Sequence, residues 1–300
     1  MNNATPAAEL GWKKWVVGSR PRTLPAAVVP VMVGAACASA DSPVWWRVSL
    51  ALVVSLALQV GVNYANDYSD GIKGTDADRV GPLRLVGSGV ASASSVKRAA
   101  LIAFGVAGVA GLSLAFMTTF WLLLVGACAI VAAWTYTGGP RPYGYAGLGE
   151  VFVFVFFGVV ATVGTQYVMS ETFTVAGWVS SIAVGAYACA LLVVNNLRDI
   201  RGDTEVGKRT LAVKMGDART RQFFAVLVVL ATASIVWVGV ITQPFAMAGL
   251  VGVIATRPAL NDIAKGLKGR DLIPVLGAVG RAQLILAVTF TVGIYFALQP

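Results

Sequence analysis

Residues 174–197 read TVAGWVSSIAVGAYACALLVVNNL, and no charged side chain interrupts them. An α-helix needs about 20 mostly apolar residues to cross the hydrocarbon core of a bilayer, so this stretch is long enough to span one. The residues that follow, RDIRGD over 198–203, mix basic and acidic side chains. An uncharged run that ends in a charged cluster is typical of a membrane helix that emerges into water.

The rest of the chain repeats this pattern. Hydrophobic residues make up 57% of the 300 residues and charged residues 12%, about half the charge of a soluble domain. Apolar runs predict nine spans, at residues 24–40, 44–66, 98–117, 119–137, 147–169, 174–197, 221–242, 244–260 and 279–298. Pro25 and Pro30 weaken the first prediction and Pro244 the eighth, because proline disrupts a helix interior. We therefore expect one all-α, polytopic membrane domain over residues 1–300.

The basic residues predict the orientation of the spans. Nine spans create connections and tails that alternate between the two sides of the membrane. All but Arg47 of the 23 Lys and Arg fall on one side. Because positive charge collects on the cytoplasmic side, the tail over 1–20 is predicted to be cytoplasmic and the C-terminus external.

Composition excludes several classes of function. The chain has no histidine, which removes Ser-His-Asp hydrolysis and His-ligated metals. Its three cysteines all lie in apolar runs, so a disulfide framework or a zinc site is not expected. The net charge of +9 is spread in short bursts between apolar runs. This distribution favours contact with membrane lipid and not with nucleic acid.

Two polar clusters follow the second and sixth predicted spans. The first reads NYANDYSD over residues 63–70, and the second reads NNLRDIRGD over 195–203. Asn63 and Asp67 are four apart, and so are Asn195 and Asp199, which places each pair on one helix face. Four spans separate the copies, so both end on the cytoplasmic side. The pattern predicts two weakly repeated four-helix units, with Asp-rich loops over 67–97 and 198–220.

Closely spaced carboxylates repel one another, so their negative charge must be neutralised. Like charges three or four apart destabilise a helix, and at a membrane interface they are also desolvated. One reading is a solvated acidic helix end neutralised by nearby Lys and Arg. The other, which the recurrence favours, is magnesium, which takes one or two carboxylates, waters and substrate phosphates. The candidate metal ligands are Asp67, Asp70, Asp76, Asp78, Asp199 and Asp203.

Basic side chains are interleaved with these acids. Acid and base together around a metal suit a polyanion, of which a diphosphate is the simplest. The candidate diphosphate partners are Lys73, Arg79, Arg84, Arg141, Lys208 and Arg209. Among them we predict direct contacts from Arg84, Lys208 and Arg209. Asn63, Asn66, Asn195 and Asn196 are candidate substrate-binding amides on the same helix faces.

Four sequence blocks, in a fixed order along the chain, together carry a resemblance to a known family. They are SRPRTLP over 19–25, NDYSDGIKGTDADRVGPLR over 66–84, YTGGPRPYGYAGLGE over 136–150 and GKRTLAV over 207–213. Together they resemble the UbiA superfamily of intramembrane prenyltransferases, and most closely its members that prenylate 1,4-dihydroxy-2-naphthoate in menaquinone biosynthesis. Gly74 stands where the general motif has a third aspartate, so Asp76 or Asp78 is the replacement. Arg141 stands where the superfamily usually has a lysine after its tyrosine.

The resemblance implies nine helices around a central cavity and two Mg²⁺ ions held by the Asp motifs. It also implies a bacterial plasma-membrane enzyme whose site opens to the cytoplasm. A polyprenyl diphosphate would react there with dihydroxynaphthoate, losing CO₂ and diphosphate and giving demethylmenaquinone. Asp67, Asp70, Asp199, Asp203 and Tyr136 are the implied catalytic residues. Side chains within 151–160 are candidates to line the isoprenoid pocket.

The sequence leaves two interpretations open for several residues. Tyr136 is either an interfacial anchor or an active-site residue, and Tyr143 and Tyr145 are interpreted as interfacial anchors. Glu150 either complements a helix dipole or contacts the acceptor's hydroxyls. Arg20 and Arg22 either reach the acceptor's carboxylate or anchor the chain on lipid headgroups. The alternative functions are prenyl transfer to another acceptor, such as 4-hydroxybenzoate, and membrane transport.

Overall fold

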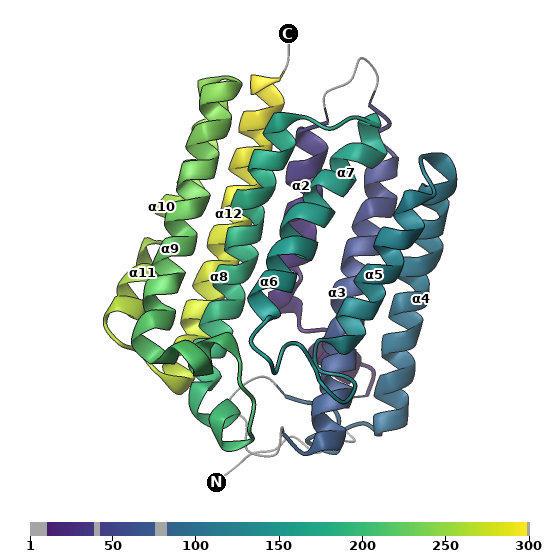
Figure 1. Cartoon of the computed structure of the whole chain (residues 1–300), viewed down its shortest axis with the longest axis vertical. Helices are drawn as coiled ribbons and strands as arrows, with labels where there is room; N and C mark the ends of the chain where they lie inside the picture. The colour runs from purple at the N-terminus through teal and green to yellow at the C-terminus, as the bar shows by residue number, and fades with distance from the viewer. Residues whose placement is uncertain (1–10, 39–42, 76–82, 299–300) are drawn as a thin grey trace.

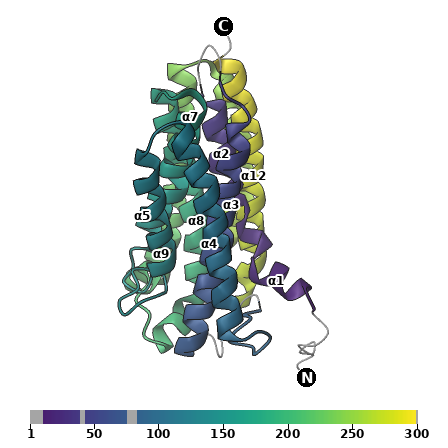
Figure 2. The ribbon, with the colours of Figure 1, turned by 90° about the vertical axis from the view of Figure 1, so that its right-hand side faces the viewer.

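The protein is described here by a computed structural model that covers residues 11–38, 43–75 and 83–298. Every regular element in these ranges is helical, which confirms the all-α prediction. The long helices lie side by side in one bundle (Figures 1 and 2). In chain order the elements are α1 (Lys13–Gly18), η2 (Pro21–Thr23), α2 (Pro25–Ala36), α3 (Arg47–Lys73), α4 (Ala93–Met117), α5 (Trp121–Thr135), α6 (Gly149–Val153), η3 (Phe154–Val160), α7 (Ala161–Ser170), α8 (Val175–Glu205), α9 (Leu211–Ile241), η4 (Pro244–Gly249), α10 (Leu250–Ile254), α11 (Arg257–Ala264), η5 (Gly269–Asp271) and α12 (Leu272–Ala297).

The helices overlap the predicted apolar runs, although the run over 244–260 is interrupted between α10 and α11. Within the described residues, six helical segments are long and apolar enough to cross a membrane. Shorter apolar segments, Pro25–Ala36, Trp121–Thr135 and Pro244–Ile254, stand at three other predicted spans. Two of these short segments contain the prolines noted above, and Pro25 and Pro244 each stand in the first turn of their helix, where no backbone N–H is needed. The count of nine spans stays a prediction.

The two Asp-rich segments differ from the prediction. Residues 67–97 and 198–220 were expected to be loops, but α3 continues to Lys73, α8 continues to Glu205, and α9 already begins at Leu211. Helical hydrogen bonding does not stop where the apolar run stops, because backbone groups pair equally well outside the lipid. Gly74 ends α3 in the left-handed conformation, with φ of 70°. The polar motifs are therefore presented on rigid helix ends.

The interior is centred on α8. In its apolar stretch 78% of residues are buried, compared with 33–44% for the other long spans. The largest buried cluster joins α8 to α2, α9 and α12, and a smaller cluster joins α3 to α4. The α3–α4 and α8–α9 pairs have the most extensive contacts. The same relation thus occurs once in each half of the chain, as the internal repeat predicts.

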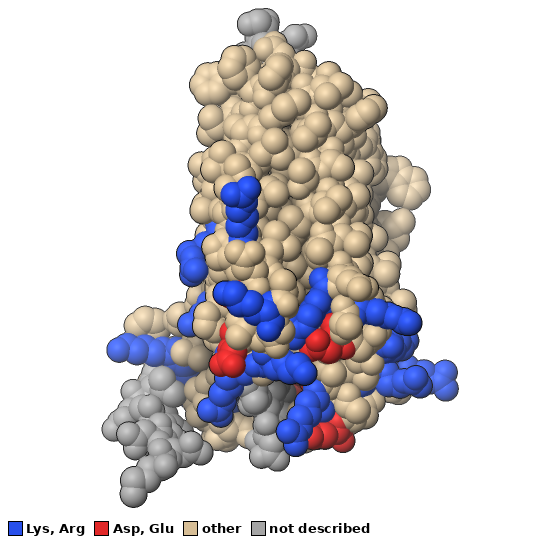
Figure 3. Space-filling view, turned by 90° about the vertical axis from the view of Figure 1, so that its left-hand side faces the viewer, with Lys and Arg blue, Asp and Glu red and all other residues tan. Residues whose placement is uncertain are grey.

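Charge divides the bundle along its length. On the face in Figure 3, Lys and Arg gather around the lower part and the upper part is uncharged. Arg47, the one basic residue predicted for the far side, donates to the carbonyl oxygens of Met117 at 3.1 Å and Val168 at 3.0 Å. It also pairs with Glu171 at 2.9 Å. These bonds satisfy carbonyls at the C-terminal ends of α4 and α7.

Candidate active site

A cavity of about 840 Å³ lies inside the bundle, which confirms the predicted central cavity. Its body is mainly apolar, and it includes aromatic side chains from α6 and η3. Polar and charged side chains line it where α3 and α8 end: Asn63, Asn66, Asp70, Arg84, Asn195, Asn196, Arg198, Asp203 and Lys208. The cavity is therefore amphiphilic, with a charged end and an apolar interior.

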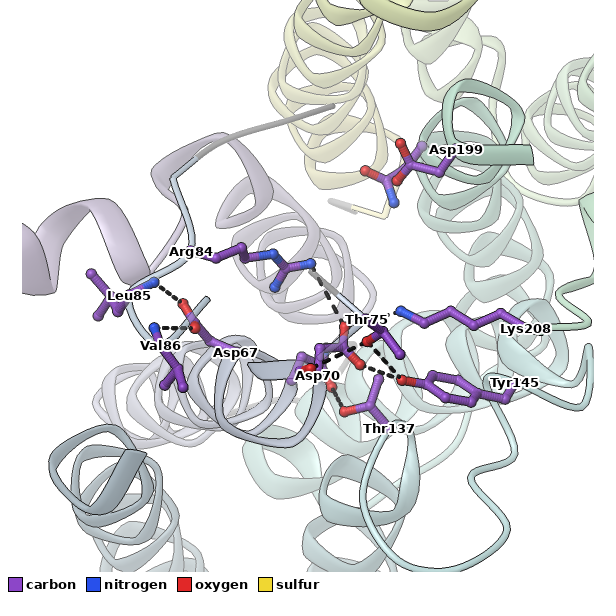
Figure 4. Close-up of polar contacts among 12 residues, drawn as sticks. Asp67, Asp70, Thr75, Arg84, Leu85, Val86, Thr137, Tyr145, Asp199 and Lys208 are labelled. Carbon is purple, nitrogen blue, oxygen red and sulfur yellow. Dashed lines mark hydrogen bonds and ion pairs between the residues drawn. The ribbon is translucent and has the colours of Figure 1, made fainter. Parts of the chain in front are cut away.

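Asp70 is the centre of the charged end (Figure 4). The hydroxyl of Tyr145 donates to its Oδ1 at 2.5 Å. Its Oδ2 lies 3.3 Å from Nζ of Lys208 and 3.9 Å from Nη2 of Arg84. The Asp70 carboxylate is only 3% exposed, so these cations offset much of the penalty for burying its charge. Asp70 and Lys208 come from opposite halves of the chain, and the fold brings the two predicted clusters together here.

Asp67 has a different environment, although it is only three residues away. Its oxygens accept hydrogen bonds from the backbone N–H groups of Leu85 at 2.8 Å and Val86 at 3.0 Å. The residue is 1% exposed and does not line the cavity. Asp67 thus holds the chain that follows Arg84 against α3, and its direction is away from the charged end of the cavity.

The second motif is divided in the same way. Asp203 lines the cavity. Asp199 receives two hydrogen bonds of 2.7 Å from the guanidinium of Arg198, and Figure 4 shows it apart from Asp70. Arg198 also donates to Oδ1 of Asn195 at 2.8 Å. Each motif therefore has one carboxylate that lines the cavity and one that accepts hydrogen bonds from neighbouring groups of the chain.

The sequence predicts an interfacial anchor at Tyr145, but its side chain lines the cavity and contacts Asp70. Besides its bond to Asp70, its ring lies 5.0 Å from Nζ of Lys73 and 4.7 Å from Nζ of Lys208, within the range of cation–π attraction. Lys73 donates to the carbonyls of Thr137 and Gly139. The position of Tyr145 inside the block over 136–150 was the available signal. Its contact with Asp70 depends on the folded loop.

Tyr136 and Tyr143 occupy the loop between α5 and α6 and both line the cavity. Burial raises the pKa of the Tyr136 hydroxyl, and the nearby carboxylates of Glu150, Asp70 and Asp203 raise the pKa further. Burial also raises the pKa of Tyr143, whose hydroxyl donates to the carbonyl of Ala132 at 2.9 Å. The raised pKa values favour the protonated form of both hydroxyls, and the Tyr143 hydroxyl is used as a hydrogen-bond donor.

The remaining candidates are distributed inside and outside the cavity. Asn66 lines it and accepts a hydrogen bond from Thr137 at 2.7 Å. Asn196 lines the cavity and donates to the buried Glu150 at 2.9 Å. Glu150 itself does not line the cavity and lies behind Asn196. Arg141 and Arg209 are exposed and do not line it. Lys73 is exposed as well, and Asp76, Asp78 and Arg79 lie outside the described residues.

The apolar wall has an unusual backbone. η3 (Phe154–Val160) is a π-helix inserted between α6 and α7. A π-turn is wider than an α-turn, so it re-aims the side chains that follow, and such turns are frequent at functional sites. Phe152, Phe156, Phe157 and Val160 all line the cavity. Gly158 packs on the backbone of Gly185 in α8. The predicted lining by residues within 151–160 is present.

A sequence profile of the UbiA prenyltransferase family matches residues 27–261. The chain belongs to the UbiA prenyltransferase family. Among family members, "1,4-dihydroxy-2-naphthoate octaprenyltransferase" of Mycobacterium tuberculosis is 49% identical over 91% of this chain and 94% of its own length. The protein of the same name from Escherichia coli is 36% identical over 88% of this chain and 94% of its own.

Solved UbiA structures agree in fold. A UbiA homologue from Aeropyrum pernix superposes with a TM-score of 0.67 at 15% identity, covering 89% of this chain and 95% of that one. A UbiA homologue from Archaeoglobus fulgidus bound to GPP and Mg²⁺ gives 0.65 at 14% identity, over 95% and 99% of the two chains. Identities this low establish the UbiA fold, while the 49% relative establishes close kinship within the family.

Proposed function

We propose that this chain transfers a polyprenyl group from polyprenyl diphosphate to 1,4-dihydroxy-2-naphthoate, with loss of CO₂ and diphosphate. The observation that carries the proposal is the amphiphilic cavity, charged around Asp70 and Asp203 and apolar along its body. A polyprenyl diphosphate is divided in the same way, into an anionic head and an apolar tail. The shared name of the relatives that are 36–49% identical supports the same donor and acceptor.

Magnesium fits the residues at the charged end. Asp70, Asp203 and Asn66 supply buried oxygen donors to one cavity. Within the described residues no group of three carboxylates surrounds one point, and Mg²⁺ commonly takes one or two carboxylates together with substrate phosphates. We propose that these side chains hold two ions. Bound there, the metal would neutralise the diphosphate and make it a better leaving group.

Arg84 and Lys208 are the proposed diphosphate partners. Both line the cavity beside Asp70, and charge-assisted hydrogen bonds from such groups suit phosphate oxygens. Tyr136 lines the same cavity, and we propose its hydroxyl as a further donor to the diphosphate. Arg141 and Arg209 had been predicted for this role from sequence. Their exposure directs the proposal to the two buried cations.

The apolar body of the cavity would serve the chemistry as well as the tail. Departure of diphosphate leaves an allylic cation, which water would destroy. The aromatic wall from α6 and η3 excludes water from it. The naphthoate ring attacks through the carbon that bears its carboxylate, forming the carbon–carbon bond. Loss of CO₂ then returns the electron pair to the ring, giving the prenylated diol, the reduced form of demethylmenaquinone.

We also propose an orientation in a bacterial plasma membrane. The charged end of the bundle would face the cytoplasm, because positive charge collects there. The first described helix begins at this end and α12 ends at the opposite one (Figure 1). The cavity would then receive the diphosphate from the cytoplasmic side, and the long product would stay in the membrane.

The test uses purified protein, Mg²⁺ and radiolabelled octaprenyl diphosphate, with 1,4-dihydroxy-2-naphthoate or 4-hydroxybenzoate as acceptor. We expect a prenylated product only from the naphthoate, released with one CO₂. EDTA should abolish turnover, and added Mg²⁺ should restore it. Product from 4-hydroxybenzoate alone would assign a different acceptor, and full activity in EDTA would contradict the metal.

A further inference from the structure

Arg20 has a strained backbone at the edge of the cavity. It lies between α1 and η2 with φ of 53° and ψ of 71°, the left-handed region that few residues other than glycine adopt. A non-glycine residue persists there only when its surroundings hold it. Such positions are frequent at ligand-binding sites.

The turn around Arg20 is fastened to α3. Asn63 donates to the carbonyl of Ser19 at 2.8 Å and to the hydroxyl of Thr23 at 3.0 Å. Gln59 donates to the same hydroxyl at 3.0 Å. The Thr23 hydroxyl in turn donates to the carbonyl of Arg20 at 2.9 Å. These bonds hold the backbone of Arg20 beside Asn63, which lies about one helical turn before Asn66 on α3.

The guanidinium of Arg20 is available for a ligand. The residue is partly buried and lines the cavity. Its Nη2 atom is buried and has no hydrogen-bond partner among the described residues. A buried donor without an acceptor is destabilising, and a buried guanidinium more so. A fixed cation with a spare buried donor, facing a substrate cavity, suits an anion.

The diphosphate is not the anion that we expect Arg20 to bind. The charged end around Asp70 already has Arg84 and Lys208. The other anionic group of the proposed reaction is the carboxylate of the acceptor. A guanidinium has the planar fork that matches a carboxylate in two parallel hydrogen bonds. Arg22, two residues on, also lines the cavity, but it is exposed, whereas Arg20 has a buried donor without a partner among the described residues.

We propose that Arg20 binds the carboxylate of the aromatic acceptor. It thereby orients the ring so that the carbon bearing that carboxylate faces the prenyl group, and it selects acceptors that carry a carboxylate. This inference rests on the proposed function, since it assumes a carboxylated acceptor. An anionic lipid headgroup is the competing ligand for Arg20, and the test distinguishes it from the acceptor.

The test compares Arg20→Gln, Arg20→Lys and the control Lys13→Gln, which removes an exposed charge from the same N-terminal segment. Each protein is placed in nanodiscs with and without phosphatidylglycerol. For Arg20→Gln we expect the KM for dihydroxynaphthoate to rise about 10- to 100-fold, the range of a lost charge-assisted hydrogen bond. The KM for octaprenyl diphosphate should change less than about twofold, Arg20→Lys should recover part of the loss, and the control should match wild type.

A second measurement does not depend on turnover. Calorimetric titration compares 1-hydroxy-2-naphthoate with 1-naphthol, which lacks the carboxylate. Wild type should bind the carboxylated compound at least tenfold more tightly, and Arg20→Gln should bind the two within about twofold of each other. An unchanged preference, or a loss in Arg20→Gln that appears only with phosphatidylglycerol, would overturn the assignment. Wild type that prefers the carboxylated compound but prenylates only 4-hydroxybenzoate would contradict the proposed acceptor and leave the role of Arg20 supported.

Discussion

Asp67 and Asp70 are neighbours on one helix end with different tasks. Asp67 faces the segment after Arg84 and accepts two backbone N–H bonds, whereas Asp70 faces the cavity, Tyr145 and Lys208. A spacing of three residues turns a side chain by about 60° around the helix axis, which is enough to separate the two environments. Spacing alone assigns both to the metal, and from their contacts we propose that Asp67 is a positioning residue and Asp70 a ligand.

Asp67→Asn tests this division. Asparagine offers one acceptor oxygen where aspartate offers two, so one backbone N–H of Leu85 or Val86 loses its partner. We expect the free energy of unfolding to fall by about 1–3 kcal/mol, with the Mg²⁺ concentration for half-maximal activity unchanged. Asp70→Asn should raise that concentration and lower kcat at least about a hundredfold. Thermal unfolding and Mg²⁺ titrations measure both, and an equal Mg²⁺ shift in the two variants would make Asp67 a ligand.

Lys208 and Arg209 form a natural pair for testing the diphosphate site. They are adjacent in sequence, but Lys208 is 6% exposed and Arg209 is exposed. Lys208→Gln should raise the KM for octaprenyl diphosphate by about 10- to 100-fold, because a buried charge-assisted contact is lost. Arg209→Gln should stay within about twofold of wild type. Steady-state kinetics in the donor substrate decide, and a larger effect at Arg209 would restore the assignment made from sequence.

At the scale of elements, the π-helix η3 connects the substrate wall to the bundle core. It lies between two α-helical segments of one span and packs on α8, the most buried helix. Gly158 and Gly185 allow the two backbones to approach closely. Small residues at such crossings are common in membrane proteins, because the gain there comes from close packing.

Gly158→Ala tests that close approach. A Cβ at this position would lie 2.6 Å from the Cα of Gly185 and 3.0 Å from the carbonyl oxygen of Ser181. Both are backbone atoms, so the helices must separate, at about 1–3 kcal/mol. Thermal unfolding in detergent should show the loss, together with a higher KM for the polyprenyl donor. Gly105→Ala in α4 is the control, since its Cβ meets no atom within 4 Å, and we expect it to be neutral or slightly stabilising.

At the scale of the whole molecule, the two ends of the bundle have different chemistry. On the face in Figure 3 the basic residues gather at one end of the bundle, and the Asp motifs lie at the C-terminal ends of α3 and α8. Arg47 is engaged by the carbonyls of α4 and α7. We expect this arrangement to give the protein one preferred direction in a membrane, because moving the basic end across the bilayer would desolvate many charges.

A topology assay tests the direction. Alkaline phosphatase fused after Pro300 should be active, since it folds only outside the cytoplasm, and green fluorescent protein at the same point should be dark. A fusion at the N-terminus should give the reverse result. Active phosphatase at both termini would require an even number of spans and would contradict the predicted count of nine.

The sequence by itself determined the class of fold, the places of the apolar helices and the four motif blocks. Long uncharged runs cannot be stable in water, and charge bursts mark the helix ends, so both are local properties that composition reveals. The helical continuation to Lys73 and Glu205 was not evident, because backbone hydrogen bonding leaves no mark in hydropathy.

Only the tertiary structure decided which motif residues share the cavity. Leu85, which donates to Asp67, lies 18 residues away in the chain, and Lys208, which donates to Asp70, lies 138 residues away. The direction of a side chain relative to distant segments depends on how helices pack, and helix packing depends on contacts between many residues at once. The same reason applies to Arg20, whose left-handed turn is held by Asn63 on another helix. Sequence therefore named the chemical groups, and the packing of α3, α8 and the N-terminal turn assigned each one its place.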